Sequence, residues 1–130
     1  MSKKLTKKDL WKVYWNQMSI RGANNYERQQ NAGFTQSMIP VIEKLYEDDE
    51  DKLEAYNRHM ENFLTQDMIS AIPVGISAAM EEANANNEDF DPSAISAVKA
   101  ALMGPLAGLG DSLLNGTARP ILASIAISFV

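Results

Sequence analysis

The stretch from Gly104 to Pro120 places the strongest constraint on how this chain can fold. It holds four glycines and two prolines together with Asp111 and Arg119, and it runs directly into the apolar residues 121–130. Glycine and proline weaken a helix, and a charged side chain in apolar surroundings is unfavourable unless it is paired or hydrated. In membrane proteins, broken helices that carry polar groups mark substrate pathways. We therefore expect a broken, re-entrant helix near the C-terminus, in which Asp111 and Arg119 neutralise each other.

Charge is distributed unevenly along the 130 residues. Only three residues after Asp91 are charged, so the last third of the chain fits a membrane better than water. Residues 1–12 contain five lysines and one aspartate, a formal charge of +4, and the net charge of −5 therefore leaves −9 on the rest. An acidic body argues against nucleic-acid binding. Because no apolar run follows the N-terminal lysines, we expect no cleaved secretory signal and a cytoplasmic N-terminus.

No motif indicates an enzyme, a metal site or a cofactor. The sequence has no cysteine and a single histidine, His59, so neither a Cys/His dyad nor a His-based metal site has its second member. The acidic run 47–51 lacks the glycine and the closing glutamate of an EF-hand loop. The glycines between residues 104 and 116 match neither a Walker loop nor a dinucleotide-binding fingerprint. His59 keeps two interpretations: a phosphohistidine, or a residue without a functional role.

The pattern of apolar residues predicts an all-α fold made of membrane-associated helices, since no stretch alternates with period two. In residues 1–22, Thr6 and Asp9 form a capping-box pattern ahead of a helix that carries Trp11 and Trp15 beside lysines. This helix fits two interpretations. It is either an interfacial helix that lies flat on a membrane, or a helix packed on the protein's own core.

Residues 23–91 are expected to form helices at the interface between cytoplasm and membrane. Gly33 and Pro40 predict a kink in a helix that begins near Asn24. The first turns of this helix carry a polar row in which Glu27 and Asn31 stack four residues apart. The row fits either a surface that faces a sugar or a partner subunit, or a solvated first turn.

A second apolar helix starts near Asp67 and ends at the paired carboxylates Glu81 and Glu82. Adjacent residues diverge by about 100° around a helix, so this pair is not expected to act together as an acid and a base. A polar linker follows, and Asp91 with the proline after it is typical of the start of the last helix. Beyond it, the neutral polar side chains near Asp111 suit a polyhydroxyl ligand.

Several long motifs occur in a fixed order along nearly the whole chain. They are Leu5–Leu10, Asn25–Arg28, Gln30–Phe34, Met38–Pro40, Lys44–Tyr46, Arg58–His59, Ala78–Glu82, Met103–Ser112, Gly116–Thr117 and Arg119–Ile121. With these motifs the sequence resembles the IID subunit of mannose-class sugar phosphotransferase (PTS) permeases.

The resemblance implies a bacterial inner-membrane subunit of a phosphoenolpyruvate-dependent system. It would pair with a IIC subunit, in an oligomer of IIC–IID pairs surrounded by membrane lipid, to carry a hexose or amino sugar inward for phosphorylation by IIB. The phosphate-carrying histidines of such systems lie on IIA and IIB, so the subunit is not expected to be an enzyme and His59 is not expected to carry phosphate. The positions that match polar family motifs, and are thus candidates for sugar binding, are Asn25, Glu27, Arg28, Asn31, Asp111, Ser112, Thr117 and Arg119.

The sequence departs from the resembling family at three places. Asn24 stands where a large aromatic residue is common, Gln66–Asp67 replaces a segment that usually contains His-Pro, and Leu114–Asn115 replaces an aromatic pair. The loss of aromatic rings and the gain of amides favour a sugar other than mannose.

Length is the largest departure from the family. Its members continue through further spans, whereas residues 121–130 supply only half of the ~20 apolar residues that one span needs. We therefore expect residues 1–130 to be the N-terminal part of a IID domain, truncated and unable to transport alone, with 92–130 forming a re-entrant segment and the start of a span. The alternative is a soluble all-helical protein-interaction module without transport activity.

Overall fold

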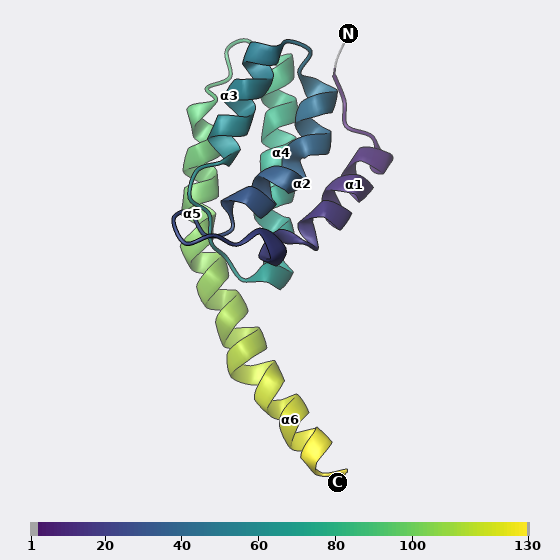
Figure 1. Ribbon diagram of the computed structural model, residues 1–130, viewed down its shortest axis with the longest axis vertical. Helices are drawn as coiled ribbons and strands as arrows, with labels where there is room; N and C mark the ends of the chain where they lie inside the picture. Colours follow the sequence, from purple (N-terminus) through teal and green to yellow (C-terminus); the bar gives the residue numbers. More distant parts are fainter. Residues whose placement is uncertain (1–2, 130) are drawn as a thin grey trace.

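The computed structural model describes residues 3–129 and consists of a compact helical body from which one long helix extends (Figure 1). The expected all-α fold is confirmed, because the described residues form helices and only two isolated β-bridges. The elements are α1 (Lys7–Gln17), η1 (Ile20–Ala23), α2 (Asn31–Leu45), α3 (Asp49–His59), η2 (Asp67–Ile69), α4 (Ala71–Asn86), α5 (Ser93–Gly110), the π-helix η3 (Asp111–Ala118) and α6 (Arg119–Ile127).

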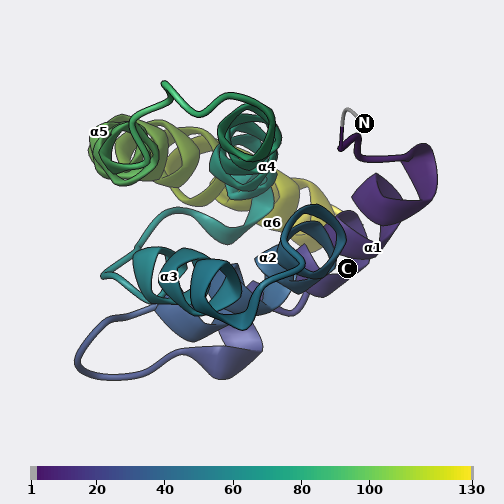
Figure 2. The same ribbon diagram turned by 90° about the horizontal axis from the view of Figure 1, so that it is seen from above.

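Helix α2 is the centre of the body, and α1, α3 and α4 pack around it (Figures 1 and 2). One face of α2 is fully buried, which follows from apolar residues at helical spacing. Burying each large apolar side chain contributes roughly 1.5–3 kcal/mol relative to leaving it exposed. The buried apolar core consists of Val13, Ile20, Phe34, Met38, Val41, Ile42, Leu45, Tyr46, Ala55, Phe63, Val74 and Ala78.

Helix α1 has the predicted capping box. The Asp9 backbone N–H donates to the Thr6 hydroxyl, and the Thr6 backbone N–H donates to the Asp9 carboxylate at 3.0 Å. A side chain of α1 also completes α2, because Pro40 cannot donate to the carbonyl four residues before it. That carbonyl, on Gln36, accepts instead from Asn16 Nδ2 at 3.1 Å.

Helix α2 starts at Asn31 and not near Asn24, so the predicted stacking of Glu27 and Asn31 on one helical face is wrong. The segment before it is a tight loop closed by two backbone hydrogen bonds between Asn25 and Gln29, and Gln29 has a positive φ of 56°. The loop forms because the Asn25 side chain accepts from the Arg28 backbone N–H at 2.7 Å, which competes with helical hydrogen bonding.

Residues 93–127 form one continuous helix, so the predicted break at Gly104 and Pro105 is wrong. A proline inside a helix removes one hydrogen bond but is compatible with helical backbone angles, and such prolines are tolerated in membrane helices. The chain does not turn back within the described residues, so the expected re-entrant turn is not present among them (Figure 1). The irregularity lies later, in the π-helix η3, whose wider turns are often found at functional sites.

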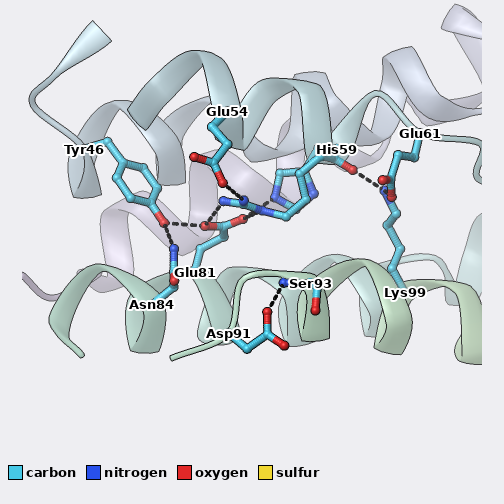
Figure 3. Close-up of polar contacts among 10 residues, drawn as sticks. Tyr46, Glu54, His59, Glu61, Glu81, Asn84, Asp91, Ser93 and Lys99 are labelled. Carbon is cyan, nitrogen blue, oxygen red and sulfur yellow. Dashed lines mark hydrogen bonds and ion pairs between the residues drawn. The ribbon is translucent and has the colours of Figure 1, made fainter. Parts of the chain in front are cut away.

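This helix has the length and composition of a membrane span. It is 35 residues long and contains an 18-residue window with a mean hydropathy of 1.3, and it alone is both long and apolar enough among the residues that the structure describes. Its start agrees with the sequence, because the Ser93 backbone N–H donates to the Asp91 carboxylate at 2.9 Å (Figure 3). The preceding linker is shorter than predicted, since α4 continues to Asn86.

Candidate functional site

A polar cleft lies where the long helix leaves the body. Its volume is about 230 Å³, below the roughly 300–1,000 Å³ of pockets for drug-sized ligands, and so suited to a small molecule. Four parts of the chain build it: the long helix, the segment around η1, the N-cap of α2 and the segment that leads into η2. The cleft is lined by Arg21, Asn24, Gln30, Leu64, Thr65, Gln66, Asp67, Ala107, Asp111, Asn115 and Arg119.

One wall of the polar cleft belongs to η3 and the start of α6. Asp111, Asn115 and Arg119 follow one another at intervals of four residues, which keeps them on one side of the helix. Asn115 Nδ2 donates to Asp111 Oδ1 at 2.9 Å. The expected pairing of Asp111 with Arg119 is not present among the ion pairs of residues 3–129, so Asp111 is held by an amide and both charges remain open to a ligand.

Gln30 holds the opposite wall in place from the N-cap position of α2. Its Nε2 donates to the Thr65 carbonyl at 3.0 Å and to Asp67 Oδ1 at 2.7 Å, while its Oε1 accepts from the Thr65 backbone N–H at 3.1 Å. The other oxygen of Asp67 pairs with Arg21 Nε at 3.1 Å. A single buried amide therefore fixes both the backbone and the carboxylate of this wall.

The two walls approach each other closely at Gly110. A Cβ at this position would collide with the side chains of Gln66 and Ile69, so only glycine lets the helix lie against the η2 segment. Thr65 lines the cleft, and its hydroxyl is buried and has no hydrogen-bond partner in the described chain. An unsatisfied buried hydroxyl is unfavourable, and a ligand in the cleft could supply the missing partner.

The structure divides the eight predicted site residues among several places. Only Asp111 and Arg119 line the polar cleft. Asn25, Glu27, Arg28 and Asn31 line a separate open cavity of about 330 Å³. Ser112 and Thr117 line neither cavity.

Most of these other residues already use their polar groups within the fold. Asn31 Nδ2 and Arg28 Nη1 both donate to the Met60 carbonyl, at 2.8 and 3.3 Å, beyond the end of α3. The Ser112 hydroxyl donates to the Leu109 carbonyl at 3.1 Å, and the Thr117 hydroxyl donates to the Ser112 carbonyl at 3.0 Å. The last bond spans five residues, which matches the spacing of a π-helix.

Sequence reasoning missed most of the polar cleft. Arg21, Gln30 and Thr65 were not predicted to belong to this site, because they are distant in sequence from the glycine-rich segment. The positions Asn24, Gln66–Asp67 and Asn115 did give a signal, since each belongs to a place where the sequence departs from the resembling family. The structure brings all of these departures to the same cleft.

A second feature that sequence reasoning missed is a buried carboxylate, Glu81, at the junction of α2, α3 and α4 (Figure 3). Glu81 accepts from the Tyr46 hydroxyl at 2.6 Å and from His59 Nε2 at 2.8 Å. Arg58 donates to both oxygens of Glu81, from Nε at 3.0 Å and from Nη2 at 3.2 Å. Asn84 donates to the Tyr46 hydroxyl at 2.7 Å. We call these five residues the Glu81 cluster.

The Glu81 cluster fixes the ionisation of its members. Burial by itself would raise the pKa of Glu81, but hydrogen bonds from His59, Arg58 and Tyr46 outweigh it and lower this pKa to about 2. Burial lowers the pKa of His59 although Glu81 opposes the shift, so the ring is neutral and donates from Nε2. Burial and the bond to Glu81 raise the pKa of Tyr46. His59 is fully buried, which argues against phosphohistidine chemistry, and its bond to Glu81 shows that it has a structural role.

Lys99 connects the long helix to this part of the body (Figure 3). It is buried, its Nζ donates to the Arg58 carbonyl at 2.8 Å, and it lies 3.7 Å from Glu61 and 5.3 Å from the centre of the Phe34 ring. A cation near the last carbonyls of α3 is favourable for the helix dipole. The long helix is thereby anchored above the point where it forms the wall of the polar cleft.

The polar cleft has the chemistry of a binding site for a neutral polar molecule. Arg21 and Arg119 oppose Asp67 and Asp111, which gives a formal charge of zero, and the remaining lining is mainly amides and a hydroxyl. Such groups can donate and accept at the same time, as several sugar hydroxyls require. No group of three metal-ligating side chains occurs within residues 3–129.

A helical body attached to one long, apolar and exposed helix, with a polar cleft at the junction, defines a membrane-associated helical protein. Residues 4–130 match the family described as "PTS system mannose/fructose/sorbose family IID component". The chain belongs to this family, as the sequence motifs predicted. The family contains membrane permease components that are not themselves enzymes. Membership of a membrane family argues against the alternative of a soluble interaction module.

Individual relatives agree with this membership. The chain is 44% identical over 126 residues to the fructose permease IID component of Bacillus subtilis (strain 168), covering 97% of this chain and 46% of that protein. It is 43% identical over 124 residues to the mannose-specific EIID component of Escherichia coli (strain K12), covering 95% of this chain and 44% of that protein. The chain thus spans slightly under half the length of these relatives.

Solved structures give the same result. A cryo-EM structure of the mannose transporter ManYZ in complex with microcin E492 contains a chain that superimposes with a TM-score of 0.93 at 41% identity, covering 98% of this chain and 47% of that one. A second similar structure, described as a membrane protein, has a TM-score of 0.88 at 42% identity and covers 97% of this chain and 46% of that one.

Proposed function

We propose that this chain is part of the IID membrane subunit of a phosphoenolpyruvate-dependent sugar phosphotransferase system. It helps a IIC subunit to translocate a hexose or amino sugar, which the cytoplasmic IIB component phosphorylates after IIA has supplied the phosphoryl group. Family membership supports this function, and so does the similarity to a chain of the mannose transporter ManYZ. The subunit lies in the bacterial inner membrane with its N-terminus in the cytoplasm, in an oligomer of IIC–IID pairs.

Within this function we assign sugar binding to the polar cleft, with Asp111 and Arg119 as its principal groups. The observation that carries the assignment is the meeting of these two residues with Asn115, Asp67 and Thr65 in one small cleft. Carboxylates accept from sugar hydroxyls and the guanidinium donates to them. The departures from the family pattern also meet here, which supports a role of the cleft in selecting the sugar.

The remaining predicted residues stay candidates of lower rank. Ser112, Thr117, Asn25, Arg28 and Asn31 all take part in hydrogen bonds inside the protein. A sugar would have to compete with these bonds. Glu27 is exposed and belongs to the separate cavity, so it also remains a candidate.

Uptake by the whole transporter tests the assignment. Asp111→Asn in the full-length subunit, expressed with its IIC partner, keeps the shape of the side chain but removes the charge. We expect a lower uptake of radiolabelled hexose, by about tenfold for the loss of one charged hydrogen bond of roughly 1.5 kcal/mol. The change should raise the KM for uptake, and co-purification with IIC should be unchanged.

A matched control is Asp89→Asn, because Asp89 is an exposed carboxylate in the linker before α5. It should leave uptake unaltered. Normal uptake by the Asp111→Asn transporter would show that Asp111 does not bind the sugar. Loss of IIC binding would show that Asp111 serves assembly instead.

A further inference from the structure

Helix α1 exposes an aromatic face that no part of the described chain covers. Trp11 is 60% exposed and Trp15 is 65% exposed, whereas Val13 and Gln17 on the opposite face are buried against the body. Single exposed apolar residues are ordinary on a protein surface, but a continuous exposed patch indicates an interaction site. This patch, the α1 aromatic face, consists of Leu10, Trp11, Tyr14, Trp15 and Met18.

The α1 aromatic face is held in a fixed orientation. Gln17 Nε2 donates to the Asp67 carbonyl at 3.1 Å and Asn16 donates to α2, so both anchor α1 from its inner side. On the outer side, the Tyr14 ring lies 5.7 Å from the Trp11 ring and 5.8 Å from the Trp15 ring, both in edge-to-face arrangements. The rings therefore form one preorganised surface. They do not behave as independent side chains.

Lysines border this face. Lys8 and Lys12 lie one turn apart beside Trp11 and Trp15, and Lys7 lines the same shallow surface as the rings. Residues 1–12 carry a formal +4 while the remainder carries −9. An anionic surface would therefore attract this edge of the molecule and repel the rest, which fixes how the body can approach it.

We propose that the α1 aromatic face docks on the anionic phospholipid surface of the membrane that the long helix crosses. Tryptophan and tyrosine rings are favourable at the level of the headgroups, and lysines can extend past them toward lipid phosphates. The C-terminal end of α1 faces the end of the body from which the long helix emerges (Figure 1). The contact is independent of sugar binding, and it sets the tilt of the body and of the polar cleft relative to the bilayer.

Tryptophan fluorescence reports directly on this contact, because the sequence has two tryptophans and both belong to the α1 aromatic face. The full chain is reconstituted into vesicles of phosphatidylcholine, with and without phosphatidylglycerol, in which a fraction of the acyl chains is brominated. We expect strong quenching and a blue-shifted emission when phosphatidylglycerol is present. Both effects should be weaker in phosphatidylcholine alone and should decrease at high salt.

The variant Lys8→Gln/Lys12→Gln tests the role of the charges. Each lysine removed should lower the ratio of docked to undocked α1 about fivefold, as expected for a lysine near an anionic surface. The matched control is Lys44→Gln/Lys52→Gln, which removes the same charge from α2 and α3 and should leave the quenching unchanged. Far-UV circular dichroism checks that both variants keep their helices.

Two results would overturn the proposal. Quenching that is equal in both lipids and insensitive to the lysine variant would show a bilayer contact without any preference for anionic lipid. An absence of quenching in vesicles, with a blue shift that appears only when the IIC partner is added, would show that a protein surface covers this face.

Discussion

The helical body and the long helix place the same kinds of side chain in opposite surroundings. In the body, the carboxylate of Glu81 is buried and receives hydrogen bonds from three residues. In the second half of the long helix, large apolar side chains are exposed, among them Leu113, Ile121, Leu122 and Ile125. The body pairs this buried carboxylate internally, whereas the helix leaves its apolar surface for a lipid or protein environment.

This difference shows where function can be located. The polar groups that are paired with one another within the Glu81 cluster hold helices together and are not available to a substrate. At the border of the two regions, in the polar cleft, Arg119 and the Thr65 hydroxyl have no partner within residues 3–129. The polar cleft therefore combines unpaired polar groups from both regions, and these groups are available to bind a ligand.

The largest expected effect comes from removing the central carboxylate of the body. Glu81→Ala would leave the buried Arg58 with only the exposed Glu54 as an ionic partner and the Tyr46 hydroxyl without its acceptor. We expect a loss of about 3–5 kcal/mol in the free energy of unfolding. Denaturant unfolding in detergent, followed by circular dichroism, measures it. The exposed Glu47→Ala should change this free energy by less than about 0.5 kcal/mol. A small effect of Glu81→Ala would show that the body does not depend on the cluster.

Acid should have the next largest effect, through the same carboxylate. The folded-state pKa of Glu81 is lowered from 4.5 to about 2, so below pH 4.5 the unfolded state binds more protons and stability falls as pH decreases toward 2. The full shift corresponds to about 3 kcal/mol. The lowered pKa of His59 acts in the same direction, since its neutral form stabilises the fold above pH 6.5 and this contribution declines below it.

Unfolding midpoints measured from about pH 7 down to about pH 3 test this dependence. Glu81→Gln should flatten the profile below pH 4.5, where the wild-type carboxylate loses its advantage. A variant profile as steep as that of the wild type would assign the acid sensitivity to other carboxylates.

The smallest expected effect comes from replacing one glycine by alanine in each of the two regions. A Cβ at Gly33 would collide with the Ile20 backbone, so Gly33→Ala should destabilise the body by about 1–3 kcal/mol. A Cβ at Gly104 meets nothing within 4 Å, so Gly104→Ala should be neutral or should stabilise the long helix by up to about 1 kcal/mol. Thermal unfolding of the two variants checks the contrast, and effects of the same sign would contradict it.

Local signals in the sequence predicted the elements whose causes are local. The capping box of Thr6 and Asp9, the apolar face of α2 and the start of α5 just after Asp91 all depend on residues within a few positions of each other. The two wrong predictions of secondary structure also came from local signals. Gly104 and Pro105 predicted a break, yet a long apolar helix absorbs one missing hydrogen bond. The polar row before Asn31 predicted a helix, yet the Asn25 side chain closes a loop.

The candidate site could be predicted only in part. Asp111 and Arg119 were identified because charges in an apolar segment need an explanation. Gln30, Thr65 and Arg21 could not be identified, since each reaches the polar cleft through a contact with a residue more than thirty positions away. His59 and Glu81 each belong to a family motif, but their contact could not be identified, because they are 22 residues apart in the sequence and meet only in the fold.

The sequence by itself determined the helical class, the family and the apolar character of the last third, because these depend on composition, spacing and short motifs. The tertiary structure decided which polar groups are used and which remain open. Hydrogen bonding and burial depend on three-dimensional distance, so the same types of side chain became an internal support around Glu81 and an open cleft beside Asp111.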